Sequence, residues 1–268
     1  MVDNINKTAA PSGAKGVAIQ LVTFICIVAV SGMIIPAVWK LIAGKDGGTN
    51  AMILTSAVYS VLVLFVFVRK KWCVLSPAYF QSKPWSVLFW SCLVGVGTII
   101  PESALDEIMP KLPDLVGESM TDIINNDYGY FTICIFAPLV EEVVMRGAIL
   151  RTLLNSMKSR WGAIAISALL FALIHMNPAQ MPHAFIAGLF LGWIYSRTGS
   201  VLPGIVYHWV NNTIVFVVAR MMPQFADSNL IEIFGGDHKR VGLAIIFSLF
   251  ILLPSIYQLA VRTKQDRA

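Results

Sequence analysis

Charged residues are scarce in this sequence. Only 13% of the 268 residues are Asp, Glu, Lys or Arg, whereas 57% are hydrophobic. Soluble domains usually carry about 25% charged and about 45–50% apolar residues. The deficit excludes an ordinary soluble fold and predicts an integral membrane protein, with the lipid bilayer as its surroundings.

Cysteine is also sparse. The four cysteines, at positions 26, 73, 92 and 134, form no Cys-x-x-Cys pair. The sequence therefore indicates neither a disulfide framework nor a thiolate metal site. Three of the four lie in apolar runs, so we expect the cysteines to serve as small buried hydrophobic residues.

No stripe of Lys and Arg interleaved with aromatic residues is present, so nucleic acid is not an expected partner. The net charge of +5 instead fits the surplus of Lys and Arg in cytoplasmic membrane loops. Basic residues follow alternate apolar runs, as in Arg69, Lys70, Lys71, Lys158, Arg160, Arg197 and Arg262. The segment 102–127 holds seven acidic residues and one lysine. This pattern predicts that both termini are cytoplasmic and that the acidic segment faces the opposite side.

Long apolar runs make up most of the sequence. A membrane-spanning helix needs about 20 mostly apolar residues, and eight runs reach or approach that length. We therefore predict an all-α fold, a polytopic membrane helix bundle of about eight transmembrane helices. The expected helices are 17–42, 51–68, 85–100, 128–154, 161–175, 181–196, 201–221 and 241–261.

The runs follow one another closely, which indicates a single membrane domain over residues 17–268. Residues 1–16 are predicted to form a cytoplasmic N-terminal tail. The first run is too long for a signal peptide and lacks a small-x-small cleavage site, so we interpret it as a retained helix. A bacterial inner (cell) membrane is the expected location.

The fourth run contains three ionisable residues within six positions, Glu141, Glu142 and Arg146. A charge at the centre of a membrane helix costs about 2.5–3.5 kcal/mol, so such residues usually mark a functional site. Glu142 and Arg146 are four residues apart and share a helix face, where they can form a charge-assisted hydrogen bond. Glu141 points elsewhere and is the candidate for chemistry.

Two further motifs place polar residues in later runs, Phe171-x-x-x-His175 and His208-x-x-x-Asn212. The spacing of four puts His208 and Asn212 on one helix face, from which Asn211 points away. At about 1.5 Å of rise per residue, the motifs lie at comparable depths, His175 being somewhat high. We therefore expect the three motifs to converge on one cavity.

A glutamate, two histidines and an asparagine suit hydrolysis. The glutamate can act as general base on a water, and a protonated histidine or an amide can donate to an oxyanion. Glu141, His175 and His208 could instead hold a zinc ion with an open position. Chains of acidic residues and histidines also relay protons in membranes. A proton- or ion-coupled transporter, or an immunity factor that acts by binding, therefore stays an alternative.

Other intramembrane hydrolases fit poorly. The apolar runs contain no His-Glu-x-x-His, Gly-x-Ser-x-Gly or Gly-x-Gly-Asp motif. The three motifs that are present resemble, in order, those of the CAAX-protease and bacteriocin-processing family of intramembrane endopeptidases, also called the Abi family. The run from Gly188 to His208 is similar to that family's connection between its second and third motifs. The resemblance covers the motif-bearing core at 128–220.

The resemblance implies an eight-helix bundle with a conical cavity. Inside it, a peptide bond of a membrane-associated protein or peptide would be hydrolysed. By position, Glu141 and His175 would activate the water, and His208 and Asn212 would stabilise the oxyanion. Glu142 and Arg146 would support the site.

The resemblance leaves the cofactor open. The family is commonly classed with the metallopeptidases, and a metal-free glutamate mechanism is also argued for it. An amide such as that of Asn212 is a poor zinc ligand and a good oxyanion donor. We therefore expect no obligatory cofactor, with zinc on Glu141, His175 and His208 as the alternative.

Overall fold

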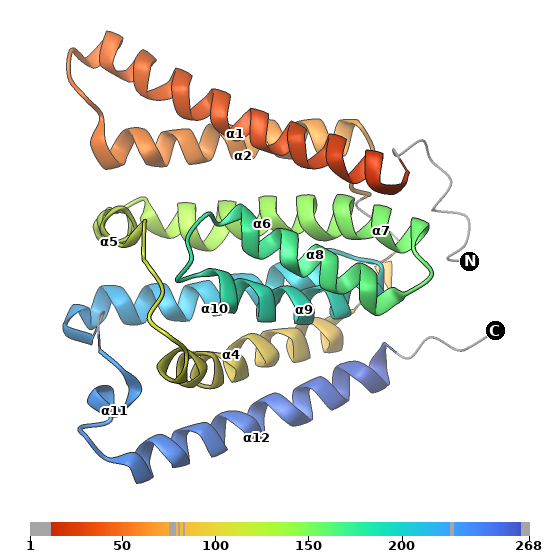
Figure 1. The fold of residues 1–268 in the computed structure, drawn as a ribbon, viewed down its shortest axis with the longest axis vertical. Coiled ribbons are helices and arrows are strands. Elements are labelled where there is room, and N and C mark those ends of the chain that lie inside the picture. Colours follow the sequence, from red (N-terminus) through yellow and green to blue (C-terminus); the bar gives the residue numbers. More distant parts are fainter. Residues whose placement is uncertain (1–11, 75–78, 80, 83, 226–227, 264–268) are drawn as a thin grey trace.

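The computed structural model describes residues 12–74, 79, 81–82, 84–225 and 228–263. All regular elements in these ranges are helices, which lie side by side in one bundle (Figure 1). The predicted all-α fold is confirmed. Residues 1–11 of the predicted N-terminal tail lie outside the described residues, and residues 13–16 already belong to the first helix.

Seven long helices coincide with predicted runs. They are α1 (Gly13–Ala43), α2 (Gly48–Arg69), α4 (Trp85–Ile108), α8 (Arg160–Ile174), α9 (Met181–Thr198), α10 (Leu202–Met221) and α12 (His238–Arg262). The third was predicted to stop at residue 100, but α4 continues through Pro101 for two more turns. Proline is tolerated inside membrane helices because neighbouring groups satisfy the backbone that it frees. The shorter elements among the described residues include α5 (Gly117–Asn125), η3 (Pro223–Phe225) and α11 (Leu230–Ile233).

The remaining predicted run is one uninterrupted helix of changing pitch. Its parts are η1 (Phe131–Phe136), α6 (Ala137–Glu142), η2 (Val143–Leu150) and α7 (Arg151–Ser156), of which η1 and η2 are π-helical. Pro138 explains the first widened stretch, because proline has no N–H and its ring clashes with the carbonyl four residues before it. π-Helical turns are rare and frequently occur at functional sites. The two glutamates end the α-helical part between the two π segments.

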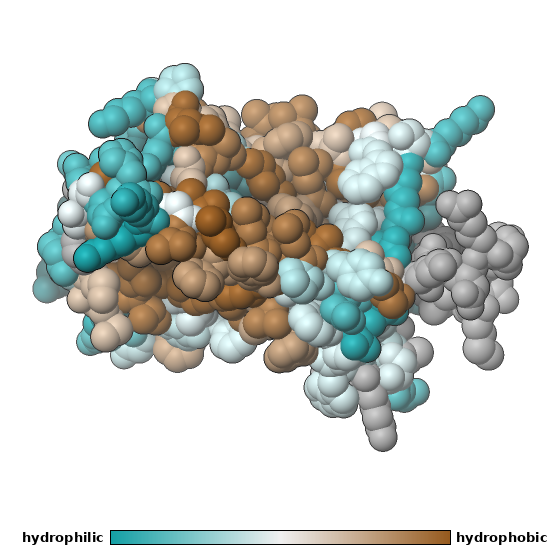
Figure 2. All heavy atoms as spheres, turned by 90° about the horizontal axis from the view of Figure 1, so that it is seen from below, coloured by the Kyte–Doolittle hydropathy of each residue, from teal (hydrophilic) through white to brown (hydrophobic). Residues whose placement is uncertain are grey.

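Five of the described helices are long and apolar enough to cross a membrane: α1, α2, α4 over Trp85–Leu105, α10 and α12. The helix Arg160–Ile174 is apolar but shorter. Hydrophobic residues gather in a band across the middle of the molecule, with hydrophilic residues at both ends (Figure 2). This distribution confirms an integral membrane bundle. That eight helices cross the membrane stays a prediction.

Basic residues connect the loops at one end of the bundle. Arg151 donates to the backbone carbonyls of Lys71 and Trp72, beyond the end of α2. Arg197 donates to the carbonyl of Ala260 near the end of α12. The beginning of α1 and the end of α12 lie at this same end (Figure 1). The side of the membrane to which this end belongs stays a prediction.

The acidic segment lies at the opposite end. There Arg220 of α10 donates to the carbonyls of Ile124 and Asn126, and Asn126 donates to the side chain of Asn50. These bonds hold α5 against α2 and α10. The separation of basic and acidic ends agrees with the charge pattern of the sequence.

The four cysteines are free, and their burial differs. Cys73 and Cys134 are buried, as expected of small hydrophobic residues. Burial raises the pKa of the Cys73 thiol to about 12, although the nearby Arg151 opposes the rise. Cys26 departs from the expectation, because it is exposed on α1. Its face of the helix meets the surroundings of the bundle instead of its core.

Candidate active site

The two adjacent glutamates have different surroundings, as the helix geometry predicts. Glu142 Oε1 lies 2.8 Å from Arg146 Nη1, and their side chains are 0% and 1% exposed. Burying either charge alone would cost several kcal/mol, so each requires the other. Glu141 has no partner within its own helix among the described contacts, and its side chain is 20% exposed. The buried ion pair therefore anchors the segment from which Glu141 projects.

Phe171 joins the three motifs. The guanidinium carbon of Arg146 lies 4.3 Å from the centre of the Phe171 ring, a cation–π contact. The same ring meets the imidazoles of His175 and His208 edge-on, with centroid distances of 4.9 and 5.9 Å. Phe171 thus packs against one residue from each motif and fixes their relative positions.

His208 lies between the two carboxylates. Its Nε2 is 3.6 Å from Glu141 Oε2, and its Nδ1 is 3.7 Å from Glu142 Oε1. Both separations are longer than a hydrogen bond, and the buried Nδ1 has no hydrogen-bond partner among the described residues. These separations leave room for small movements or for a bridging water. The imidazole is oriented by groups on both of its edges.

His175 is the C-cap residue of α8. Its Nδ1 is 2.8 Å from the backbone oxygen of Phe171. A carbonyl oxygen is only an acceptor, so this contact places the proton on Nδ1 and leaves the lone pair on Nε2. A ring in this tautomer can accept a proton from a water.

Asn212 was expected to stabilise an oxyanion, but its side chain also bonds to the protein backbone. Its amide donates to the backbone oxygen of Ile133, at 3.0 Å. In the π-helical pattern, that oxygen would be bonded by the N–H five residues later, and this residue is Pro138. The N–H of Ala137 is bonded to Thr132 instead. Asn212 therefore supplies the donor that Pro138 lacks, which leaves one amide N–H for an oxyanion.

Gly204 makes room for Glu142. A methyl group at position 204 would lie 2.5 Å from Glu142 Oε2, well inside van der Waals contact. The backbone of α10 can thus approach α6 closely enough to bring His208 to the glutamates. The adjoining Pro203 lies in the first turn of α10, where proline is tolerated because its missing N–H has no partner within the helix.

The donor geometry does not form a three-ligand metal site. Among the described residues, no group of three His, Cys, Asp or Glu side chains is placed to hold a metal ion. Catalytic zinc needs three protein ligands at about 2.0–2.2 Å from one point. Glu141 and His208 face each other, but His175 bonds to its own helix on another edge of Phe171. As placed, these residues suit proton transfer better than zinc.

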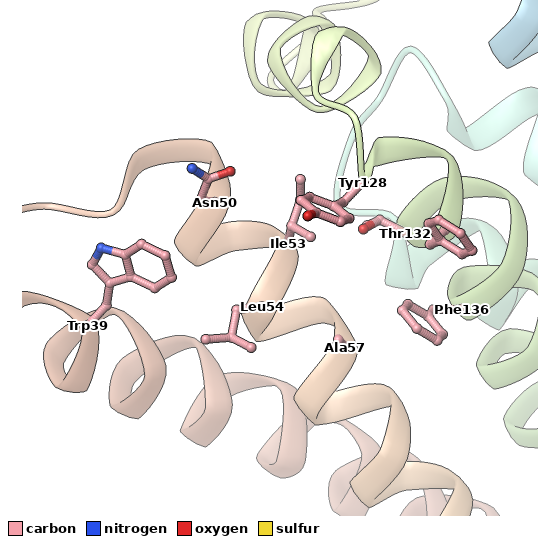
Figure 3. Close-up of a pocket in the computed structure, with 9 residues that line it drawn as sticks. Trp39, Asn50, Ile53, Leu54, Ala57, Tyr128, Thr132 and Phe136 are labelled. Carbon is pink, nitrogen blue, oxygen red and sulfur yellow. The ribbon is translucent and has the colours of Figure 1, made fainter. Parts of the chain in front are cut away.

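A hollow of about 470 Å³ lies between α1 and α2 on one side and η1 on the other (Figure 3). It is mostly apolar and comes within five residues of Glu141 along the helix. Its lining consists of Trp39, Asn50, Ile53, Leu54, Ala57, Tyr128, Phe131, Thr132 and Phe136.

Comparison with known proteins identifies the same part of the chain. Residues 127–214 match the family model described as type II CAAX prenyl endopeptidase Rce1-like. Over these residues the chain is similar to type II CAAX prenyl endopeptidases. The match spans all three motifs and agrees with the predicted motif-bearing core. No curated protein and no solved structure matches the chain.

This similarity supports an intramembrane endopeptidase in general terms. The structure brings Glu141, Glu142, Arg146, His175 and His208 together around Phe171. Asn212, on α10, bonds instead to the backbone of η1. The sequence analysis did not assign roles to Phe171 and Gly204. Phe171 was part of a predicted motif, but its spacing did not show which residues it would contact. The Pro203-Gly204 pair at the start of α10 was the one sequence feature that could have drawn attention to Gly204.

Proposed function

We propose that this protein hydrolyses a peptide bond of a membrane-associated protein or peptide, using Glu141 to activate water. The observation that carries the proposal is the approach of Glu141 Oε2 to His208 Nε2, at 3.6 Å, between α6 and α10. A partly exposed carboxylate facing an imidazole, both held by buried groups, is the arrangement that general acid–base catalysis requires.

The roles follow from the contacts of each side chain. Glu141 takes a proton from the water, and His175 assists through the lone pair of its Nε2. His208, with carboxylates on both edges, donates to the oxyanion as the carbonyl carbon is attacked. Asn212 contributes its second N–H to the same oxyanion. The proton held by Glu141 then passes to the leaving amine.

The apolar hollow supports a substrate that approaches from the membrane. We infer that an apolar part of the substrate lies between α2 and η1, with the scissile bond beside Glu141. The family name points to peptides that carry a prenylated cysteine. A farnesyl chain is of the right chemistry for a hollow lined by tryptophan, leucine and phenylalanine side chains.

A substitution of Glu141 tests the general base. Glu141→Gln keeps the shape of the side chain and removes the base, so cleavage should fall by about 10²–10⁴-fold without loss of folded protein. The assay is release of a fluorophore from a farnesylated peptide, with three residues after the modified cysteine, by protein in lipid vesicles. Glu118→Gln is the matched control, because Glu118 is an exposed carboxylate on α5.

Wild-type rates in Glu141→Gln would contradict the proposed base. Absence of cleavage by the wild-type protein, for farnesylated and unmodified membrane peptides alike, would contradict the endopeptidase. Uptake of protons or ions into vesicles that depended on Glu141 would then favour the transporter.

A further inference from the structure

The turn between α8 and α9 is held by one buried side chain, that of Asn177. This residue lies two positions after His175 and is 0% exposed. A buried amide needs hydrogen-bond partners, because leaving its groups unpaired costs about 1–3 kcal/mol. Asn177 finds them more than 60 residues away in the sequence.

The partners belong to residues 109–116, the segment that connects α4 to α5, which we call the strap. The backbone N–H of Leu115 donates to Asn177 Oδ1 at 2.9 Å, and Asn177 Nδ2 donates to Asp114 Oδ1 at 3.0 Å. A backbone bond of 3.2 Å from Ala179 to Pro113 extends the contact. Both the donor and the acceptor of the amide are thus used on the strap.

His175 needs such support, since it sits where α8 ends. Its ring is bonded to the carbonyl of Phe171, within the last turn of the helix. The next residue, Met176, has a φ of +49°, in the left-handed region that side chains other than glycine, asparagine and aspartate seldom adopt. Strained backbone of this kind persists only where the surroundings hold it. The side-chain bonds of Asn177 to the strap come directly after Met176 in the sequence and can hold its backbone in this conformation.

We propose that Asn177 is a positioning residue for His175, acting by clamping the α8–α9 turn to Asp114 and Leu115 of the strap. The inference rests on the proposed function, in which His175 assists the attack of water. With the clamp formed, α8 ends at a fixed residue and the His175 ring keeps its place against Phe171. Without it, the turn relaxes at Met176 and the imidazole leaves the position that faces the water.

The test compares three variants in the vesicle assay with the farnesylated peptide. Asn177→Ala removes both bonds, and Asn177→Asp sets a second carboxylate against Asp114. Both should lower kcat by about 10²-fold, the effect of a displacement of about 1 Å, with KM little changed. The double variant Asp114→Asn/Asn177→Asp exchanges donor and acceptor between the two side chains. It should recover part of kcat, because the Val116 N–H that also donates to Asp114 Oδ1 loses its acceptor. A residue that only stabilised the fold would not show recovery from this exchange.

The matched control is Asn229→Ala, which removes an asparagine that caps α11 through a local bond to Glu232. It should leave kcat unchanged. Unchanged kcat in Asn177→Ala, or a double variant no better than Asn177→Asp, would overturn the proposal.

A second readout separates this inference from the proposed function. Diethylpyrocarbonate modifies accessible imidazoles, and mass spectrometry gives its rate at His175 without any substrate. The rate should rise in Asn177→Ala and return toward the wild-type value in the double variant. If the wild-type protein cleaves no peptide, the proposed function fails, and an unchanged rate at His175 would independently overturn the clamp.

Discussion

The side chain of Asn212 bonds to the backbone oxygen of Ile133 at 3.0 Å, across the boundary between α10 and η1. The oxygen depends on this bond because the residue that would otherwise donate to it is Pro138. The same amide that was expected to face an oxyanion therefore also completes the helix that carries the glutamates. Its removal should affect both stability and catalysis.

This relationship gives a prediction about coupling. Asn212→Ala should lower the free energy of unfolding by about 1–3 kcal/mol, because the oxygen of Ile133 loses its donor. In a Pro138→Ala background, the new N–H at position 138 can bond to that oxygen, and Asn212→Ala should cost clearly less. Denaturant unfolding in detergent micelles measures the free energy of unfolding of the wild type, the two single variants and the double variant. Additive effects of the two substitutions would contradict the role assigned to Pro138.

The buried ion pair gives a second prediction. Arg146→Ala leaves Glu142 charged and unpaired, which typically costs about 3–5 kcal/mol. The melting temperature of the Arg146→Ala variant should therefore fall further than that of the Asn212→Ala variant. Arg240→Ala is the matched control, because it breaks an exposed pair with Asp237 and should cost at most about 1 kcal/mol.

The same pair can also be replaced as a unit. Glu142→Gln/Arg146→Met removes both charges and should recover much of the stability lost in Arg146→Ala. Equal stability of Arg146→Ala and Asn212→Ala would argue against the anchoring role of the pair.

Gly204 gives a third prediction. Replacing glycine by alanine inside a helix usually stabilises it by about 1 kcal/mol. Gly204→Ala should instead destabilise the protein and reduce cleavage, because the methyl group would lie 2.5 Å from Glu142 Oε2. Gly242→Ala on α12 is the matched control, since nothing lies within 4 Å of its methyl group. Stabilisation by both substitutions, measured by thermal unfolding, would show that α10 and α6 need not approach so closely.

The fourth prediction concerns metal. Because the described donors do not converge as three ligands, purified active protein should retain full activity after treatment with a chelator. Elemental analysis of the same preparation should find no stoichiometric transition metal. One zinc per chain, with activity lost on chelation and regained on adding zinc, would assign Glu141, His175 and His208 to a metal site instead.

Local sequence features sufficed for much of this protein. The length of the apolar runs determined the helices, because a backbone in a bilayer must satisfy its own hydrogen bonds. The spacing of four residues determined the pairing of Glu142 with Arg146, since both lie on one turn of the same helix. The resemblance of the three motifs pointed to the part of the chain, residues 127–214, that matches the family model.

Contacts between segments that are far apart in the chain could not be predicted from the sequence. No spacing within α10 shows that Asn212 meets a carbonyl freed by a proline some 74 positions earlier in the chain, nor that Asn177 is clamped by the strap. The π-helical pitch around the glutamates was equally hidden, because it depends on which backbone groups find partners on neighbouring helices. Helix formation and i,i+4 pairing are local, so the sequence determined them. The orientation of His208 between two carboxylates and the support of His175 depend on how helices pack, and only the tertiary structure decided them.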